Sequence, residues 1–173
     1  MKILLSWLND YGHFADPSDT DAVQRLADTM TALGLEVEDV AHVGATVAGV
    51  VTARVLRLEQ HPDAAKVQRV YVDAGDGAER HVWCGAFNMA VGDRVPLATL
   101  GTTMPGGMKI ERRKLRGEWS NGMLCSAREI GLGDDHAGIL VLEGDPALGT
   151  PIADVLGIEP DVLWELEVNP NRP

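Results

Sequence analysis

The sequence predicts a mainly β fold, in which a small β-barrel is inserted into a small α/β (α+β) domain formed by both ends of the chain. Short valine-rich segments, separated by Gly, Pro and Asp turns, fill the middle of the chain, a pattern typical of a barrel. Both ends combine helical periodicity with short strands and are acidic. We therefore expect residues 1–40 and 152–173 to form the α/β domain and residues 41–151 the barrel.

The predicted α/β domain begins with a strand at residues 2–5 and a helical turn that Ser6 can cap, with Trp7, Leu8 and Tyr11 facing inward. From residue 20 the apolar residues recur every three or four positions until Gly34, which predicts an amphipathic helix. Alternation then predicts a strand at residues 35–43. After residue 151, a short helix ending at Gly157 and a last strand at residues 161–168 complete the domain.

The predicted barrel strands are separated by clear turn signals. Pro62 ends the first strand, since proline cannot join a central ladder, and Trp83 is expected in the core with its neighbours. The near-even spacing of the strands predicts a closed barrel. The expected strands cover residues 47–58, 66–72, 79–84, 94–100, 109–116 and 138–142.

Charge is unevenly distributed along the chain. The net charge of −11 and the pI near 4.7 argue against a general nucleic-acid binder. However, residues 46–151 hold 12 cations and 13 acids, whereas residues 1–45 hold 2 and 8, and residues 152–173 hold 1 and 5. The nearly neutral middle and the acidic ends therefore indicate units with separate roles.

The cations concentrate at residues 109–116, which contain five Lys and Arg and one acid, Glu111. In a strand, Arg112, Lys114 and Arg116 would share one face, where like charges repel. An anionic partner such as a phosphate backbone explains this row, and so does a solvated edge strand that basic residues protect from pairing. Trp119 follows closely and can either stack on a base or pack within the fold.

Other chemistries find little support in the sequence. His, Cys84 and Cys125 show no metal-ligand spacing, and no nucleophile elbow or phosphate-binding glycine loop is present. A Cys125 nucleophile with His136 is conceivable, but the apolar run around Cys125 favours buried, inert thiols. No segment approaches a membrane span, so we expect a cytoplasmic protein without a membrane partner.

Four segments resemble a known family. They read HPDAAKVQRVYVDAG (residues 61–75), WCGAFN (83–88), VGDRVPLATLG (91–101) and LRGEWSNGMLCSAREIGL (115–132). They are similar to the tRNA-binding OB-fold domain of free-standing tRNA-binding proteins, methionyl-tRNA synthetases and the bacterial phenylalanyl-tRNA synthetase β subunit. The start MKILLSWLNDY and the ending ELEVNPNRP resemble the β subunit, so we expect an N-terminal fragment of a longer chain.

The resemblance implies a barrel of the OB type and membership in an aminoacyl-tRNA synthetase. That enzyme is an α2β2 ligase that makes phenylalanyl-tRNA from phenylalanine, ATP and tRNA with Mg²⁺. Its catalytic and editing residues lie outside the segment that this chain resembles. We therefore expect a non-catalytic fragment that binds tRNA, pairs with an α subunit in the complete enzyme, and holds no cofactor or metal itself.

The resemblance also implies which residues border the RNA. The family's segment after the basic strand matches this chain from Ser120 to Glu129, whereas Ala65 replaces the family's usual acid. Two alternatives stay open: a module that only packs within the synthetase, and a free-standing tRNA-binding protein. The candidate tRNA contacts are Arg112, Lys114, Arg116, Ser120 and Asn121, with Lys66 and Arg69 as weaker candidates.

Overall fold

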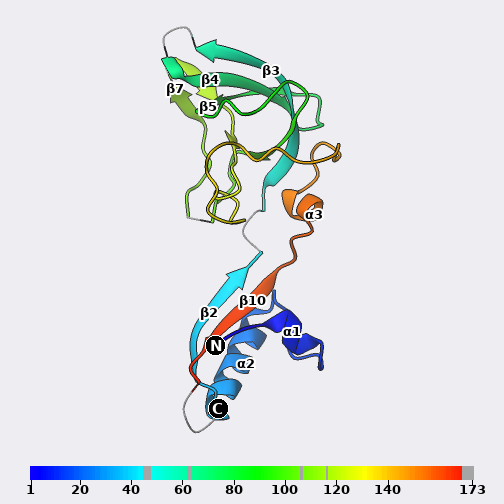
Figure 1. The fold of residues 1–173 in the computed structure, drawn as a ribbon, viewed down its shortest axis with the longest axis vertical. Helices are drawn as coiled ribbons and strands as arrows, with labels where there is room; N and C mark the ends of the chain where they lie inside the picture. Colours follow the sequence, from blue (N-terminus) through cyan, green and yellow to red (C-terminus); the bar gives the residue numbers. More distant parts are fainter. Residues whose placement is uncertain (45–47, 62–63, 106, 116, 169–173) are drawn as a thin grey trace. The chain divides into compact units, whose positions relative to one another are not determined.

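The computed structural model describes residues 1–44, 48–61, 64–105, 107–115 and 117–168. The chain divides into two compact units (Figure 1), the first formed by residues 1–45 and 159–173 and the second by residues 46–158. These boundaries differ from the expected ones on both sides. Residues 41–43 continue a strand of the first unit, and Ile152 is fully buried in the core of the second.

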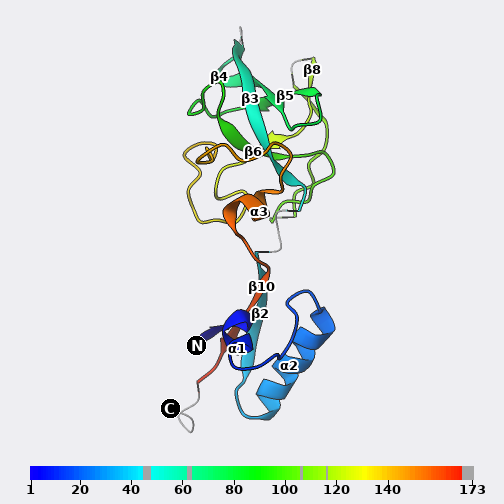
Figure 2. The ribbon, with the colours of Figure 1, turned by 90° about the vertical axis from the view of Figure 1, so that its right-hand side faces the viewer.

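The first unit contains a three-stranded antiparallel sheet in the order β1–β10–β2. These strands are β1 (Lys2–Leu4), β10 (Asp161–Leu166) and β2 (Val37–Val43). Two helices, α1 (Leu5–Asn9) and α2 (Thr20–Ala32), belong to the same unit (Figure 2). The Asp19 side chain caps α2 by accepting a hydrogen bond from the Ala22 amide at 2.9 Å. Alternate residues of β10 are buried against the helices, and the core consists of Leu5, Ala15, Val23, Ala27, Met30, Val162, Trp164 and Leu166.

Two expectations for α1 were wrong. Ser6 does not cap the helix with its own side chain. Instead, its amide and hydroxyl donate hydrogen bonds of 3.1 and 2.6 Å to the Asp161 carboxylate. Trp7 and Tyr11 do not face the core, since 55% and 89% of their surface is exposed. A five-residue helix turns only one side inward, and Leu5 takes that position.

The second unit contains a five-stranded antiparallel sheet in the order β5–β4–β3–β6–β9, and a separate hairpin of β7 and β8. The break expected at Pro62 lies outside the described residues, but β3 ends at His61 and β4 begins at Ala64 on either side of it. The strands are β3 (Val50–His61), β4 (Ala64–Asp73), β5 (Glu79–Cys84), β6 (Arg94–Ala98), β7 (Arg113–Leu115), β8 (Glu118–Ser120) and β9 (Met123–Leu124).

This sheet is OB-like in its strand order, but no ladder closes it into a barrel among the described residues. The Asn121 amide donates a 2.9 Å hydrogen bond to the His81 carbonyl, and the Trp83 amide donates one of 3.2 Å to the Ser120 hydroxyl. The sheet therefore curves so that residues 120–121, just before β9, reach β5. Single hydrogen bonds join the two there in place of a β-ladder. The expected strand at residues 138–142 is reduced to one bridge between Arg94 and Leu142.

Two apolar clusters stabilise the second unit. The first fills the concave side of the sheet with alternate residues of β3, β4 and β5, such as Val55, Val70 and Val82. The second gathers Val50, Ile110, Cys125 and Ile152 below it. Ile152 comes from helix α3 (Ile152–Leu156), which ends at Gly157 in the left-handed conformation, with φ 62°.

Candidate nucleic-acid interface

A basic hairpin presents the cations that the sequence singled out. We give this name to residues 112–120, which contain β7 and β8; residue 116 lies outside the described residues, so the structure does not place Arg116. The guanidinium carbon of Arg112 and the Nζ atom of Lys114 lie 5.0 and 5.8 Å from the ring centroid of Trp119. Both cations therefore lie over the ring of Trp119, of whose surface 43% is exposed. The strand expected at residues 109–116 is shorter, since β7 covers only Arg113–Leu115 and Arg112 precedes it.

The cations of the second unit fall into two groups. Arg54, Arg57, Arg69, Arg80 and Arg94, which all lie in strands of the sheet, are ion-paired with Asp or Glu. Six others lie outside every ion pair found among the described residues: Lys66, Lys109, Arg112, Arg113, Lys114 and Arg128. Positive charge that is open to an external anion is thus concentrated at and beside the basic hairpin.

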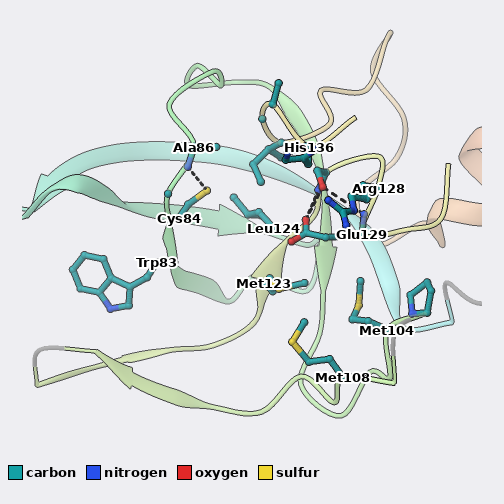
Figure 3. Close-up of a pocket in the computed structure, with 16 residues that line it drawn as sticks. Trp83, Cys84, Ala86, Met104, Met108, Met123, Leu124, Arg128, Glu129 and His136 are labelled. Carbon is teal, nitrogen blue, oxygen red and sulfur yellow. Dashed lines mark hydrogen bonds between the residues drawn. The ribbon is translucent and has the colours of Figure 1, made fainter. Parts of the chain in front are cut away.

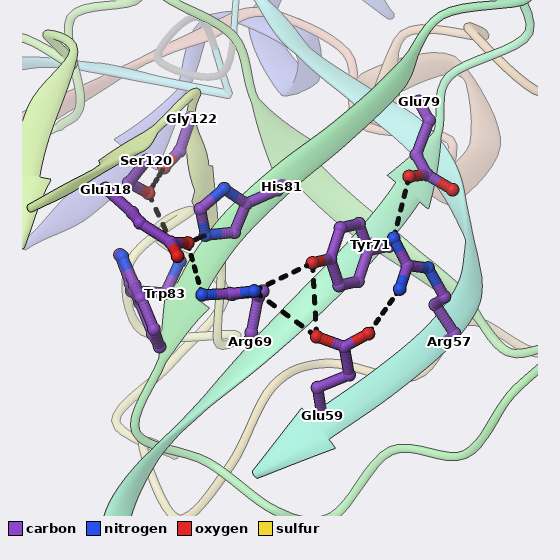
Figure 4. A network of polar contacts seen from close by, with 10 residues as sticks. All are labelled: Arg57, Glu59, Arg69, Tyr71, Glu79, His81, Trp83, Glu118, Ser120 and Gly122. Carbon is purple, nitrogen blue, oxygen red and sulfur yellow. Dashed lines mark hydrogen bonds and ion pairs between the residues drawn. The ribbon is translucent and has the colours of Figure 1, made fainter. Parts of the chain in front are cut away.

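The outer face of β3, β4 and β5 carries a network of aromatic and charged side chains (Figure 4). Tyr71 stacks on His81, with ring centroids 5.6 Å apart, and the Arg57 guanidinium carbon lies 3.4 Å from the Tyr71 ring centroid. Arg57 pairs with Glu59 and, at 3.1 Å, with Glu79. The acids therefore neutralise the cations on this face, although OB-type sheets commonly bind ligands there.

Arg69 joins this network to the basic hairpin. Its guanidinium pairs with Glu59 at 3.3 Å and with Glu118 of β8, and it lies 5.1 Å from the ring centroid of Trp83. A hydrogen bond to the Tyr71 hydroxyl and the pair with Glu118 raise the pKa of Arg69. Arg69 is therefore a constant cation, but one whose charge is already used within the fold.

His81 lies between the sheet and the hairpin. Burial lowers the pKa of its imidazole, and the nearby Arg69 charge lowers it further, whereas Glu118, 3.9 Å away, opposes both effects. His81 is therefore held neutral near physiological pH and adds no positive charge to the interface.

The remaining predicted contacts divide by burial. Ser120 is buried, and its hydroxyl donates a 3.1 Å hydrogen bond to the Gly122 carbonyl while accepting one from the Trp83 amide. The Asn121 backbone ties the chain to β5, and its side chain is half-buried. Lys66 is exposed at the start of β4. The structure therefore brings Arg112 and Lys114 together at one surface and uses Ser120 within the fold.

Trp83 is a residue whose position the sequence analysis missed. Val82 and Cys84 point into the core, so Trp83, between them, belongs to the outer face and is half-buried there. The strict alternation of a strand could have shown this, because valine at residue 82 is the better core residue. With Trp119, Trp83 gives the region beside the basic hairpin a second indole.

The two cysteines are free and buried, as the sequence predicted. Burial raises the pKa of the Cys84 thiol and raises the pKa of Cys125 to about 12. Neither is a nucleophile at neutral pH. Among the described residues, no group of three or more His, Cys, Asp or Glu could hold a metal ion.

Comparison with known proteins agrees with this picture. The sequence profile of the family described as "Putative tRNA binding domain" matches residues 50–151, which is most of the second unit. The chain therefore belongs to this family of tRNA-binding domains.

The curated relatives give a more particular relationship. The chain is 49% identical over its whole length to the phenylalanine–tRNA ligase β subunit of Anaeromyxobacter dehalogenans, and covers 21% of that protein. It is 41% identical over its whole length to the same subunit of Salinibacter ruber, covering 22% of it. The chain thus spans about a fifth of the length of these relatives.

A solved structure is also similar, the MetRS-related protein of Pyrococcus horikoshii. The match covers 58% of this chain and 85% of that one, with 16% identity and a TM-score of 0.43. Separately, the helices of the described segments include none that is both long and apolar enough to cross a lipid bilayer.

Proposed function

We propose that the second unit binds tRNA through the basic hairpin, as part of a phenylalanine–tRNA ligase β subunit. One observation carries this proposal. Arg112 and Lys114 flank the exposed indole of Trp119 and lie outside the ion pairs of the described residues, whereas the five sheet arginines are all paired. Cations without acidic partners, beside an exposed aromatic ring, suit a phosphate backbone with accessible bases.

The mode of binding follows from these groups. Phosphate contacts release counterions, so affinity should fall as salt rises, and they read little sequence. Trp119 can stack only on a base that is not already paired. Loops, ends or bent elements of tRNA are therefore the favoured targets, rather than its regular helices.

The activity of the complete protein is part of the same proposal and rests on its relatives. By analogy with them, it would join phenylalanine to tRNA in the cytoplasm, using ATP and Mg²⁺ and an α subunit as partner. Because the chain spans about a fifth of these relatives, we assign ATP, Mg²⁺ and catalysis to regions of the enzyme that this chain does not span.

A second role is favoured by a separate observation on the first unit. Trp7, Tyr11 and Phe14 are at least half exposed, and such apolar surface commonly packs against another part of a larger protein. A role for the whole chain as a packing module is thus the alternative to tRNA binding. A free-standing tRNA-binding protein is less well supported, because the relatives match the first unit as well as the second.

Titration of fluorescently labelled tRNA with the chain, followed by anisotropy at low salt, tests the proposal. The double variant Arg112→Ala, Lys114→Ala should weaken binding by about tenfold or more, because each phosphate contact of this kind contributes on the order of 1 kcal/mol. Absence of tRNA binding by the unmodified chain would contradict the proposal and favour the packing role. If the double variant bound tRNA as tightly as the unmodified chain, the RNA would have to bind outside the basic hairpin.

A further inference from the structure

A cavity of about 700 Å³ opens beside the basic hairpin. A second hollow of about 300 Å³ shares Trp83, Met108 and Met123 with it, and Lys109, Arg113 and Lys114 line that hollow. The two hollows are thus neighbours with a shared wall, and we call this region the methionine trough, defined by Trp83, Met104, Met108 and Met123. The volume of the larger hollow lies in the range of about 300–1,000 Å³ that is typical of small-ligand sites.

The floor of the trough is apolar and polarisable (Figure 3). Met104 is buried, Met108 is 40% exposed, and the half-buried Met123 lies between them and Trp83. Thioethers and an indole attract flat aromatic groups, since sulfur and aromatic rings make favourable contacts. Such a floor suits a planar ring better than an aliphatic chain.

The walls are held by hydrogen bonds within the fold. The Asn88 side chain donates to the Ile139 carbonyl at 2.8 Å and accepts from the Ile139 amide at 2.9 Å, which fixes the segment at residues 136–139. On another side, the Ser126 amide and hydroxyl donate to one Glu129 carboxylate oxygen at 2.6 and 2.9 Å. Glu129 thereby directs its charge to its own loop. The trough is thus largely preformed, which reduces the entropic cost of binding.

The rim is cationic. Arg128 and His136 lie together at one end of the large cavity (Figure 3), and Lys109, Arg113 and Lys114 line the adjoining hollow. Among the described residues, Lys109, Arg113, Lys114 and Arg128 take part in none of the ion pairs. Two acids line the same hollows, Glu111 and Glu129, so the four cations leave a net excess of two positive charges there. In a chain of net charge −11, this excess beside an apolar floor is complementary to a ligand that joins a flat ring to negative charge.

We propose that the methionine trough binds one unpaired nucleotide of an RNA strand, with its base on Trp83, Met108 and Met123 and its flanking phosphates toward Arg128 and Lys109. This inference rests on the proposed function and deepens it, because it adds a base-binding site to the phosphate-binding hairpin. An apolar peptide would gain nothing from the four cations, and a free phosphate would gain nothing from the floor.

The test compares two single-stranded oligonucleotides of equal length, one with bases and one abasic, each with a fluorescent label. The unmodified chain should bind the base-bearing strand at least about fivefold more tightly, since base stacking of this kind is sequence-tolerant and substantial. Met108→Ala should reduce this preference by about two- to tenfold, in line with sulfur–aromatic contacts, and leave the abasic strand unaffected. Leu100→Ala, at an exposed residue outside the trough, is the matched control and should keep the preference.

The two proposals fail in different ways. Equal binding of both strands, with Arg112→Ala, Lys114→Ala still weakening both, would overturn the nucleotide site and leave the basic hairpin in place. An unchanged preference in Met108→Ala would also overturn it, because Met108 is the most accessible part of the floor. If neither strand nor tRNA binds at low salt, both proposals fail together.

Discussion

Cys84, at the end of β5, and Cys125, directly after β9, are free thiols, and both are almost fully buried. Burial keeps them protonated, and Cys125 has a pKa of about 12. We expect a thiol reagent such as DTNB at about pH 8 to label neither cysteine rapidly in the native chain, and to label both in urea. Rapid release of two equivalents under native conditions would show that the thiols are accessible and would contradict the core described here.

His81 makes stability depend on pH. Burial and Arg69 lower its pKa in the folded chain below the ordinary value of 6.5, so the unfolded chain takes up a proton first as the pH falls. The contribution of His81 is therefore complete above pH 6.5 and is lost as the pH falls toward the folded pKa. His81→Asn should flatten the decline in the free energy of unfolding between about pH 7.5 and about pH 5.5, measured by urea denaturation.

The exposed His42 provides the control for this measurement. His42→Asn makes the same chemical change on the exposed surface of β2 in the first unit, whereas Arg69 and the hairpin belong to the second unit. It should therefore keep the pH dependence of the unmodified chain. If both variants behave alike, the neutral state of His81 plays no part in the pH dependence.

At the scale of elements, the segment at residues 136–139 is held in place by one side chain, Asn88. A Cβ atom at Gly138 would lie 2.5 Å from the Asn88 amide group, so Gly138→Ala must displace that side chain and its two hydrogen bonds to Ile139. We expect a loss of about 1–3 kcal/mol in the free energy of unfolding. Gly85→Ala is the matched control, because its Cβ would meet nothing closer than the Lys66 carbonyl at 3.7 Å.

Urea denaturation of the two glycine variants measures whether the contact of Asn88 with Ile139 stabilises the fold. A Gly138→Ala variant as stable as Gly85→Ala would mean that the Asn88 contact does not hold this wall of the trough.

The regular elements were largely predictable from the sequence, because their signals are local. Apolar periodicity places α2 at Thr20–Ala32, and alternation places β4 and β5 within a residue or two. Less predictable was which side of a short element faces inward. Trp7 and Trp83 were both expected inside, yet Leu5 and Val82 occupy the core positions, since packing decides between neighbouring apolar residues.

The candidate site was only partly predictable, because ion pairing depends on residues that are distant in the sequence. Nothing in the sequence distinguishes Arg69 from Arg112, but Arg69 pairs with Glu59 and Glu118, whereas Arg112 lies over the Trp119 ring and takes part in none of the ion pairs among the described residues. The methionine trough has no sequence signal at all. Its lining comes from β5, from the loops around Met104 and Met108, and from residues 126–139, which only the folded chain brings together.

At the scale of the whole molecule, an acidic chain concentrates its available positive charge in one region. The net charge of −11 opposes RNA at long range, and salt screens that repulsion beyond about 8–10 Å. The unpaired cations of the basic hairpin act at contact distance. Long-range repulsion by the net charge and short-range attraction by these cations together predict a modest, salt-sensitive affinity for tRNA that depends on few residues.

The salt dependence of tRNA affinity tests this account most directly. Two double variants remove the same charge: Arg112→Gln, Lys114→Gln in the basic hairpin, and Arg54→Gln, Arg80→Gln among the ion-paired sheet arginines. Affinity is measured by anisotropy across a series of salt concentrations. The slope of log K against log[salt] is negative, and the hairpin variant should reduce its magnitude by about 1.4–1.8, as expected for two lost phosphate contacts, whereas the sheet variant should leave it unchanged. Equal slopes for all three chains, or a loss in the sheet variant alone, would contradict the assignment of tRNA to the basic hairpin.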